Sequence, residues 1–348
     1  MSARADLLAA ASREVLIKDG PYGTAIQNAK LTEEGYAGDT GLTKDQKGNN
    51  DLVNLTQPAL IRSICDEYIA AGARVLATNT FNANSISQAD YGAERLVRDI
   101  NVAAAKVIRE ACDDATARDG KQRFVCGAIG PTNKTLSLSP DVEDPGFREV
   151  TFDEIVAVYH EQSAALIEGG VDTILIETVF DTLNCKAAIM AVKQLEAELG
   201  RDVPIMISMT LTDLSGRNLS GHTVEAFWYA VRHANPVTIG LNCSFGADQL
   251  RPHVQSLSSL ADTLLMAYPN AGLPNELGEY DELPETTAGF VRQWAENGQA
   301  NILGGCCGST PAHIAAVARA VEGITPRTVP EIETSMRLSG LEAFVVAA

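Results

Sequence analysis

The sequence is short of positive charge. It has 27 lysines and arginines against 45 aspartates and glutamates, which gives a formal net charge of −18 over 348 residues. Nucleic acids and anionic membranes are bound mainly through clustered cations, so this balance argues against both as partners. We therefore expect the partners to be small molecules or other proteins.

Long apolar runs are also missing. No stretch reaches the ~20 consecutive apolar residues that a membrane-spanning helix needs. The opening segment, MSARADLLAAASREV, has neither the continuous apolar core nor the cleavage pattern of a secretory signal. We expect a cytoplasmic protein. In that reducing compartment seven cysteines, an odd number, are poorly explained as a disulfide framework.

What the sequence does contain is a set of eight short runs rich in valine, isoleucine and leucine, with helical patterns between them. The runs are apolar throughout rather than alternating, which is typical of parallel strands buried on both faces. Eight strand-then-helix units predict a closed (β/α)8 barrel of the TIM type. The runs cover residues 15–19, 75–81, 124–130, 172–178, 204–210, 238–244, 263–269 and 301–305.

The segments between these runs carry helix signals. Thr151 and Glu154 have the spacing of a capping box, and Thr310-Pro311 has the form of a helix start that Gly323 can end. Residues 31–56 and 132–150 break the regular spacing, and because both follow strands we expect both on the rim of the barrel. With 45% hydrophobic residues, we expect one domain over 1–348, with a core at about 13–325 and a C-terminal extension at 326–348.

Three cysteines stand where two of the predicted strands end. Cys243 lies in the motif GLNCS on the sixth strand, and Cys306 and Cys307 lie in GGCCG on the eighth. Barrel closure gathers strand ends around one mouth, so the three thiols can converge there. Three thiolates with one open position favour catalytic zinc. The competing interpretation is that they are small buried residues in a glycine-rich turn.

Adjacent side chains normally diverge, so the use of both Cys306 and Cys307 on one ion needs an unusual backbone. The glycines at 304, 305 and 308 supply that freedom. The remaining cysteines lie in apolar strand or helix patterns, and we assign them to packing. They are Cys65, Cys112, Cys126 and Cys185.

Several longer motifs make the sequence recognisable. On these residues it resembles the homocysteine S-methyltransferase family, and most closely the homocysteine-binding module of cobalamin-dependent methionine synthase, from about residue 13 to 340. The motifs are DGPYGT at 19–24, GNNDLVNLTQP at 48–58, TNTF at 78–81, GPTNKTLSLSPDVEDPGFREVTFDE at 130–154, IET at 176–178, GLNCS at 240–244, YPNAGLPN at 268–275 and GGCCG at 304–308.

The resemblance implies a zinc-containing (β/α)8 barrel in which Cys243, Cys306 and Cys307 bind the metal and act in catalysis through it. Zinc would keep the thiol of homocysteine ionised at neutral pH, where a free thiol with a pKa of ~8.5 is mostly protonated. The immediate methyl donor would be methylcobalamin on a partner module or chain. Cobalamin-binding and methyltetrahydrofolate-binding modules on separate chains are then the expected partners.

The charged end of homocysteine needs its own contacts. Two acids at strand ends, Asp19 and Glu177, are candidates for its ammonium, although either could be a structural carboxylate. The loop that contains Gly20, Gly23 and Thr24 is the candidate for its carboxylate, because glycines allow close backbone approach. Two asparagines complete the prediction: Asn242 as a substrate contact and Asn270 as a metal ligand in the substrate-free state, with an ordinary turn asparagine as the alternative for Asn270.

Three other functions compete with this interpretation. The nearest is the same chemistry with betaine or S-methylmethionine as the donor. A zinc hydrolase on the same fold is disfavoured, since three thiolates make zinc a poor activator of water and no histidine or carboxylate accompanies the cysteines as a base. A non-catalytic homocysteine-binding or zinc-binding module would bind its ligand without transferring a methyl group.

Overall fold

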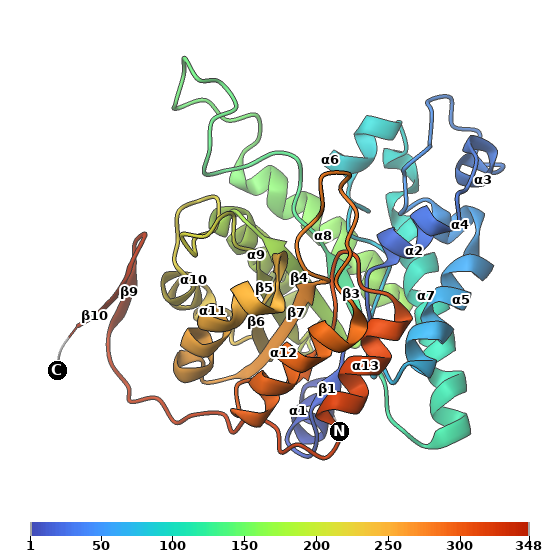
Figure 1. Ribbon diagram of the computed structural model, residues 1–348. Helices are drawn as coiled ribbons and strands as arrows, with labels where there is room; N and C mark the ends of the chain where they lie inside the picture. The colour runs from blue at the N-terminus through green and yellow to red at the C-terminus, as the bar shows by residue number, and fades with distance from the viewer. Residues whose placement is uncertain (1, 347–348) are drawn as a thin grey trace.

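The computed structural model describes residues 2–346, and its centre is an eight-stranded parallel sheet rolled into a barrel (Figure 1). The hydrogen-bonded order is β1-β8-β7-β6-β5-β4-β3-β2. Each predicted run forms a strand, so the predicted (β/α)8 barrel is confirmed. The strands are β1 (Leu16–Ile17), β2 (Val75–Ala77), β3 (Phe124–Ile129), β4 (Thr173–Val179), β5 (Ile205–Met209), β6 (Thr238–Gly246), β7 (Leu264–Asn270) and β8 (Ile302–Leu303).

The two edge strands of this sheet also meet. Lys18, just after β1, pairs with Val75 of β2 as a single parallel bridge. The amide of Asp19 donates to the carbonyl of Val75 at 3.0 Å, and the amide of Arg74 donates to the carbonyl of Ile17 at 2.8 Å. These bonds close the ring, so the carboxyl ends of all eight strands surround one mouth.

Helices pack around the outside of the barrel (Figure 1). Short 3-10 turns lie at Ala89–Tyr91, Glu94–Leu96 and Arg232–Ala234. The α-helices of the described chain are α1 (Ala3–Ala11), α2 (Tyr22–Asn28), α3 (Glu33–Ala37), α4 (Val53–Thr56), α5 (Pro58–Ala70), α6 (Ser85–Gln88), α7 (Val97–Asp119), α8 (Phe152–Gly169), α9 (Thr182–Leu199), α10 (Val224–Val231), α11 (Ala247–Leu260), α12 (Pro284–Glu296) and α13 (Pro311–Val321).

The helix signals of the sequence act as predicted. Thr151 and Glu154 form a complete capping box at the start of α8. Helix α13 begins at Pro311, is capped by Thr310, and is followed by Gly323 with a φ of 75°. Its third residue, His313, completes this cap by accepting from the Thr310 amide at 3.2 Å.

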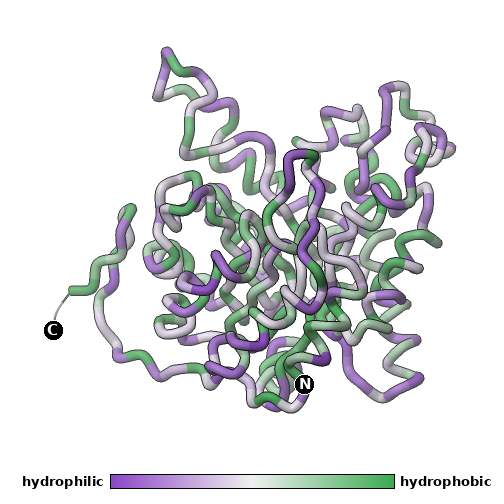
Figure 2. The backbone as a smooth tube through the Cα atoms, in the orientation of Figure 1, coloured by the Kyte–Doolittle hydropathy of each residue, from purple (hydrophilic) through white to green (hydrophobic). Residues whose placement is uncertain are grey.

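The base of the barrel, where the strands begin, is closed by α1. Its buried residues Leu7, Ala10 and Ala11 join the same apolar cluster as Leu16 and Phe124 at the strand starts. In Figure 2 the strands are mostly apolar, whereas the loops above them mix apolar and hydrophilic residues. The apolar contact with the strands explains why a helix whose remaining residues are partly or fully exposed stays in place.

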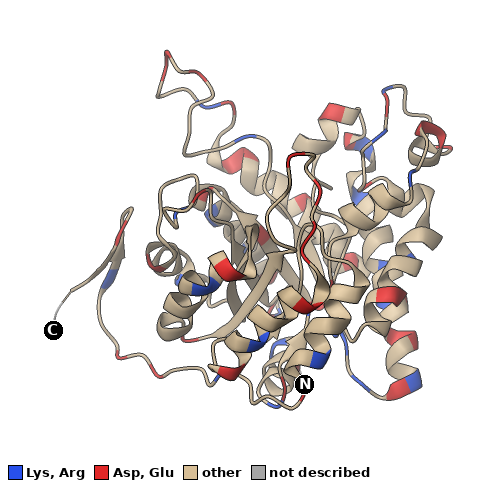
Figure 3. Cartoon of the chain, viewed as in Figure 1, with Lys and Arg blue, Asp and Glu red and all other residues tan. Residues whose placement is uncertain are grey.

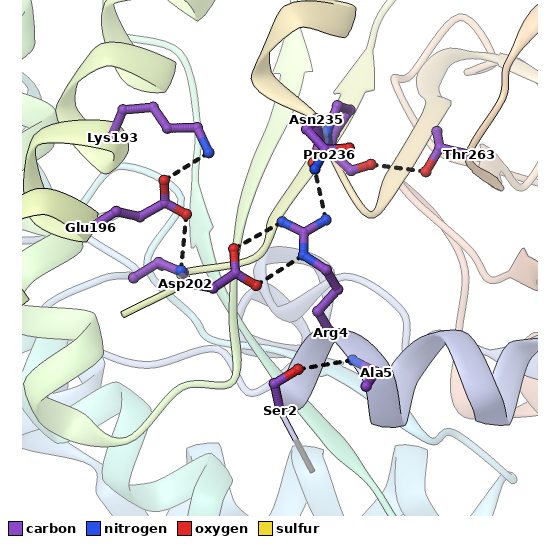
Figure 4. Close-up of polar contacts among 10 residues, drawn as sticks. Ser2, Arg4, Ala5, Lys193, Glu196, Asp202, Asn235, Pro236 and Thr263 are labelled. Atoms are coloured by element: carbon purple, nitrogen blue, oxygen red, sulfur yellow. Dashed lines mark hydrogen bonds and ion pairs between the residues drawn. The ribbon is translucent and has the colours of Figure 1, made fainter. Parts of the chain in front are cut away.

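Polar contacts fix the same helix laterally (Figure 4). The guanidinium of Arg4 forms a two-pronged ion pair with Asp202, at 2.8 and 3.1 Å, and donates to the carbonyl of Asn235 at 3.0 Å. The hydroxyl of Ser2 accepts from the Ala5 amide at 3.3 Å and caps the helix. These contacts hold α1 across the base of the barrel.

The mouth, at the opposite end, carries the long connections. The segment between β3 and α8, residues 130–151, extends far above the strands in Figure 1, and the segment after β1 that contains α3 and α4 also lies on this side. Both were predicted to lie on the rim, and both do. Within residues 2–346, no helix is both long enough and apolar enough to cross a membrane.

The C-terminal segment begins with a fixed residue and ends in a hairpin. Arg327 is buried and donates to the carbonyls of Ser258, Ala261 and Thr263. Further along, β9 (Arg337–Ser339) and β10 (Ala343–Val345) pair antiparallel. The hydroxyl of Ser339 donates to the carbonyl of Ala226 in α10 at 2.7 Å, so the hairpin rests on that helix.

Candidate metal and substrate site

The three cysteines predicted to bind metal come together at the mouth. Their Sγ atoms all lie within 4.8 Å of one another, and those of Cys243 and Cys307 are 3.8 Å apart. Cys243 lies on β6, while Cys306 and Cys307 follow β8. Each of the three is partly buried. The other four cysteines, Cys65, Cys112, Cys126 and Cys185, are buried away from this cluster in the packing.

The backbone around Cys243 is unusual. Cys243 and Ser244 have φ values of 62° and 61°, in the left-handed region, and the pairing of β6 with β7 shifts between Asn242 and Gly246. A left-handed conformation costs a non-glycine residue roughly 1–2 kcal/mol. The bulge turns the Cys243 thiol towards the cysteines that follow β8. The Ser244 hydroxyl stabilises it by hydrogen bonds to Thr210 Oγ1, at 2.8 Å, and to the carbonyl of Leu211.

Asn242 connects β4, β5 and β8 beneath the cysteines. Its Oδ1 accepts from the Ser208 hydroxyl at 2.6 Å and from the Thr178 amide at 3.2 Å. Its Nδ2 donates to Thr178 Oγ1 at 2.9 Å and to Cys306 Sγ at 3.8 Å. The side chain was predicted to contact substrate. In the structure this side chain is 1% exposed, and both of its polar atoms have protein partners. Its hydrogen bond to Cys306 positions that cysteine.

The three thiols of the cluster differ in pKa, and Cys243 is the one that ionises most readily. Hydrogen bonds from Cys306 and Cys307 lower the pKa of Cys243 to about 3, against the effect of burial. The same contacts raise the pKa of Cys306 well above its ordinary value and that of Cys307 to about 11. Ionisation of all three thiols therefore requires a cation among them.

Two observations show that a metal ion fits here. Sulfurs bound at ~2.3 Å to one tetrahedral ion lie ~3.8 Å apart, which matches the separation of Cys243 and Cys307. The side chain of Asn270 contributes to lowering the pKa of Cys243, yet its buried Oδ1 has no hydrogen-bond partner among the residues that the structure describes. An unpartnered oxygen beside three thiols is a suitable fourth ligand, and the donor set favours zinc.

A cavity of about 360 Å³ opens beside the sulfurs. Its wall contains all three cysteines and most of the residues predicted to bind homocysteine, but neither Asp19 nor Asn242 lines it. The predicted residues that do line it are Gly20, Gly23, Thr24, Glu177, Cys243, Cys306 and Cys307.

The two predicted acids differ in what surrounds them. Asp19 is fully buried; its Oδ1 accepts from Lys18 Nζ and its Oδ2 from the amide of Ala77, both at 2.8 Å. Glu177 accepts from the Tyr268 hydroxyl at 3.0 Å through Oε2 alone. Within the described chain, no donor bonds to its Oε1. Burial raises the pKa of both carboxyls.

Sequence reasoning missed several residues of this pocket, among them Tyr268 and the three described next. Lys18 was a visible signal, since it is a charged residue at the end of an otherwise apolar strand. Tyr280 reaches back from the loop after β7 into the same cavity, and burial, followed by the neighbouring Cys307 thiol, raises the pKa of Tyr280 to about 12. Asp51 lines the cavity while 4% exposed, and burial raises its pKa to about 7.

Fold and site together define a (β/α)8 barrel enzyme with a cysteine cluster, suited to a soft metal, at the mouth of the barrel. The sequence model of the family described as homocysteine S-methyltransferase matches residues 16–321. The chain belongs to the homocysteine S-methyltransferase family, and it is a methyltransferase.

Solved structures agree with this fold. The metallated form of the homocysteine methyltransferase MmuM from Escherichia coli is 22% identical, with a TM-score of 0.70, over 91% of this chain and 99% of that one. The oxidized form is 21% identical, with a TM-score of 0.70, over 92% and 99%. The apo form is 21% identical, with a TM-score of 0.64, over 90% and 99%.

Proposed function

We propose that the chain holds zinc through Cys243, Cys306 and Cys307 and methylates the sulfur of homocysteine to form methionine. In this proposal it is the homocysteine-activating component of a cobalamin-dependent methionine synthase, with methylcobalamin as the immediate donor. The observation that carries the proposal is the convergence of three sulfurs within 4.8 Å at the wall of a pocket in the mouth of the barrel. When bound, zinc supplies a Lewis acid that keeps the substrate thiol ionised at neutral pH.

The chain's own residues place the substrate. Glu177 offers Oε1 to the ammonium of homocysteine, and Tyr268 holds the other oxygen of the same carboxylate at 3.0 Å. The backbone of the loop that contains Gly20 and Gly23 lines the same cavity and suits the substrate carboxylate. Asn270 would hold the fourth position on the metal through Oδ1 until the homocysteine sulfur replaced it. Each charged end of the amino acid then has a partner of opposite charge or a donor.

The rim of the mouth supports a donor that is presented by a protein. Val142, Leu214 and Leu277 are 92%, 80% and 82% exposed and stand on the loops after β3, β5 and β7. Exposed apolar side chains on several loops of one rim offer contacts to a partner protein. Figure 3 shows acidic residues on the loop after β7, so the docking partner should be apolar with complementary basic groups. Betaine and S-methylmethionine would need no such surface.

The donor is tested by methionine formation from homocysteine. The zinc-loaded chain is offered methylcobalamin, betaine or S-methylmethionine separately, with Cys306→Ala as the control. The proposal predicts turnover with methylcobalamin alone, abolished in the variant. Turnover with betaine or S-methylmethionine would assign the chain to the direct-donor group, and homocysteine binding without any turnover would favour the non-catalytic module.

The partner surface has its own test. Val142→Ser with Leu277→Ser should slow methyl transfer from a methylcobalamin-carrying protein and leave transfer from free methylcobalamin unchanged. The control is Leu199→Ser, which removes a less exposed leucine, 47% accessible, from the far end of α9. Equal rates for the double variant and the control with the protein-bound donor would contradict docking at the rim. A cytoplasmic location with separate cobalamin and methyltetrahydrofolate modules completes the proposal.

A further inference from the structure

A lysine is buried in the floor of the substrate pocket. Lys18 is 4% exposed, follows β1, and belongs to the cavity wall together with Glu177 and Tyr268. Its Nζ lies 2.8 Å from Asp19 Oδ1 and 4.5 Å from the centroid of the Tyr268 ring. The metal site and the binding contacts described above make no use of this side chain. A buried lysine is costly unless its charge is matched, so its presence needs an explanation.

The contacts of Lys18 divide the two acids of the pocket into different roles. Asp19 has both oxygens occupied, one by Lys18 and the other by the amide of Ala77. Glu177 keeps Oε1 free of partners in the described chain, while Tyr268 orients it through Oε2. Lys18 and Asp19 cancel each other's charge. Among Lys18, Asp19 and Glu177, this leaves one negative charge, that of Glu177, which equals the single positive charge of a substrate ammonium.

We infer that Lys18 determines which acid of the pocket binds the substrate's amino group. Because Lys18 forms an ion pair with Asp19, Glu177 is the acid that contacts the substrate ammonium. Lys18 thus acts as a specificity-determining residue through Asp19. Without it, Asp19 would face the space that the lysine vacates, and a substrate ammonium could pair with it there. This inference rests on the proposed binding of homocysteine.

The inference makes an unusual prediction: loss of Lys18 should repair loss of Glu177. The readout is calorimetric binding of two thiols to the zinc-loaded chain, L-homocysteine and its amine-free analogue 4-mercaptobutanoate. The ratio of their dissociation constants measures recognition of the amino group alone. In the unmodified protein homocysteine should bind ~10–100-fold more tightly, the value of one charge-assisted contact.

Glu177→Gln should bring this ratio close to one by weakening homocysteine alone. Lys18→Met with Glu177→Gln should restore a ratio of about ten, because Asp19 is now open to the ammonium. Lys18→Arg with Glu177→Gln keeps the cation and should show no restoration. The triple variant Lys18→Met, Asp19→Asn, Glu177→Gln should also show none, since both acids are gone.

Zinc content and thermal midpoint are measured for every variant, because Lys18→Met leaves a buried carboxylate without its cation. If that variant loses zinc, Lys18→Gln replaces it; the neutral glutamine amide can donate to Asp19 but leaves its negative charge unbalanced, so the ratio must rise in the same direction. A ratio near one in all Glu177→Gln backgrounds would overturn the role of Lys18. Failure of the unmodified protein to bind homocysteine would overturn the proposed function itself, and this inference with it.

Discussion

The two ends of the barrel are built on opposite principles. At the base, Leu7, Ala10 and Ala11 of α1 are at most 1% exposed and seal the strands with ordinary helical backbone. At the mouth, Thr178, Cys243 and Ser244 adopt left-handed conformations beside the cavity that holds the cysteines. Strain and buried charge reduce stability, and they persist only where the surrounding structure enforces them. Packing at the base offsets this loss of stability, and the strained mouth positions the reactive groups.

The largest expected effect is the loss of a metal ligand at the mouth. Cys306→Ala should remove zinc and reduce methionine formation by at least ~10³-fold, because the substrate thiol then stays protonated near neutral pH. Metal analysis and the methionine assay measure this. Cys185→Ala, which changes a cysteine packed in α9, is the matched control and should keep its zinc. If the Cys306→Ala protein kept a full complement of zinc, Cys306 would not be a metal ligand and would not differ in role from the packing cysteines.

The converse change at the base should affect stability alone. Leu7 is fully buried, and its truncation to alanine should lower the free energy of unfolding by about 2–5 kcal/mol. Zinc content and homocysteine affinity of the folded protein should stay within about a factor of two, as is usual for distant sites. Urea denaturation, with and without homocysteine, tests both expectations. Loss of zinc by folded Leu7→Ala would show that the ends are not independent.

A buried carboxylate gives the mouth its own pH dependence. The pKa of Asp51 is raised to about 7 by burial. Because the folded value exceeds the unfolded one, the protonated group favours the folded state, and this contribution is lost as the pH rises from ~4 to ~7. Asp51→Asn should therefore raise stability at pH 8 by on the order of 2–4 kcal/mol and have little effect at pH 4. Unfolding curves of both proteins at the two pH values measure this difference. An equal gain in the free energy of unfolding at pH 4 and pH 8 would contradict the prediction.

The smallest expected effect is on zinc affinity, from the loss of a residue that positions the proposed zinc ligand Cys306. Asn242→Ala removes the contact with Cys306 Sγ and the bonds to Thr178, and should weaken zinc binding by ~10–100-fold. Competition with a chelator measures the affinity. Asn101→Ala is the control, since Asn101 is equally buried but bonds to the carbonyls of Ala83 and Val97 in and beside α7. Equal zinc affinities in the two variants would leave Asn242 with a packing role only.

The sequence predicted the strands and the frame of the mouth well, because regular strands and helix caps follow local patterns. It did not predict helix α1 at the base, which lies before the expected core of about 13–325. The apolar runs located all eight strands, and the motifs GLNCS and GGCCG located the sulfurs. The left-handed backbone at Cys243 and Ser244 had no such signal, since neither residue type favours positive φ. The pairing of Lys18 with Asp19 was also hidden, because which carboxylate stays open depends on three-dimensional contacts. Strained and charge-paired details are set by tertiary structure, and local sequence patterns do not reveal them.

X-ray absorption at the zinc edge, recorded with and without homocysteine, tests the central claim most directly. The account predicts three sulfurs at ~2.3 Å and one light atom, nitrogen or oxygen, in the protein alone. Addition of homocysteine should raise the count to four sulfurs as the substrate thiol replaces the light atom. A count that stays at three with bound homocysteine, or that never reaches three in the protein alone, would contradict activation of the substrate at this cluster.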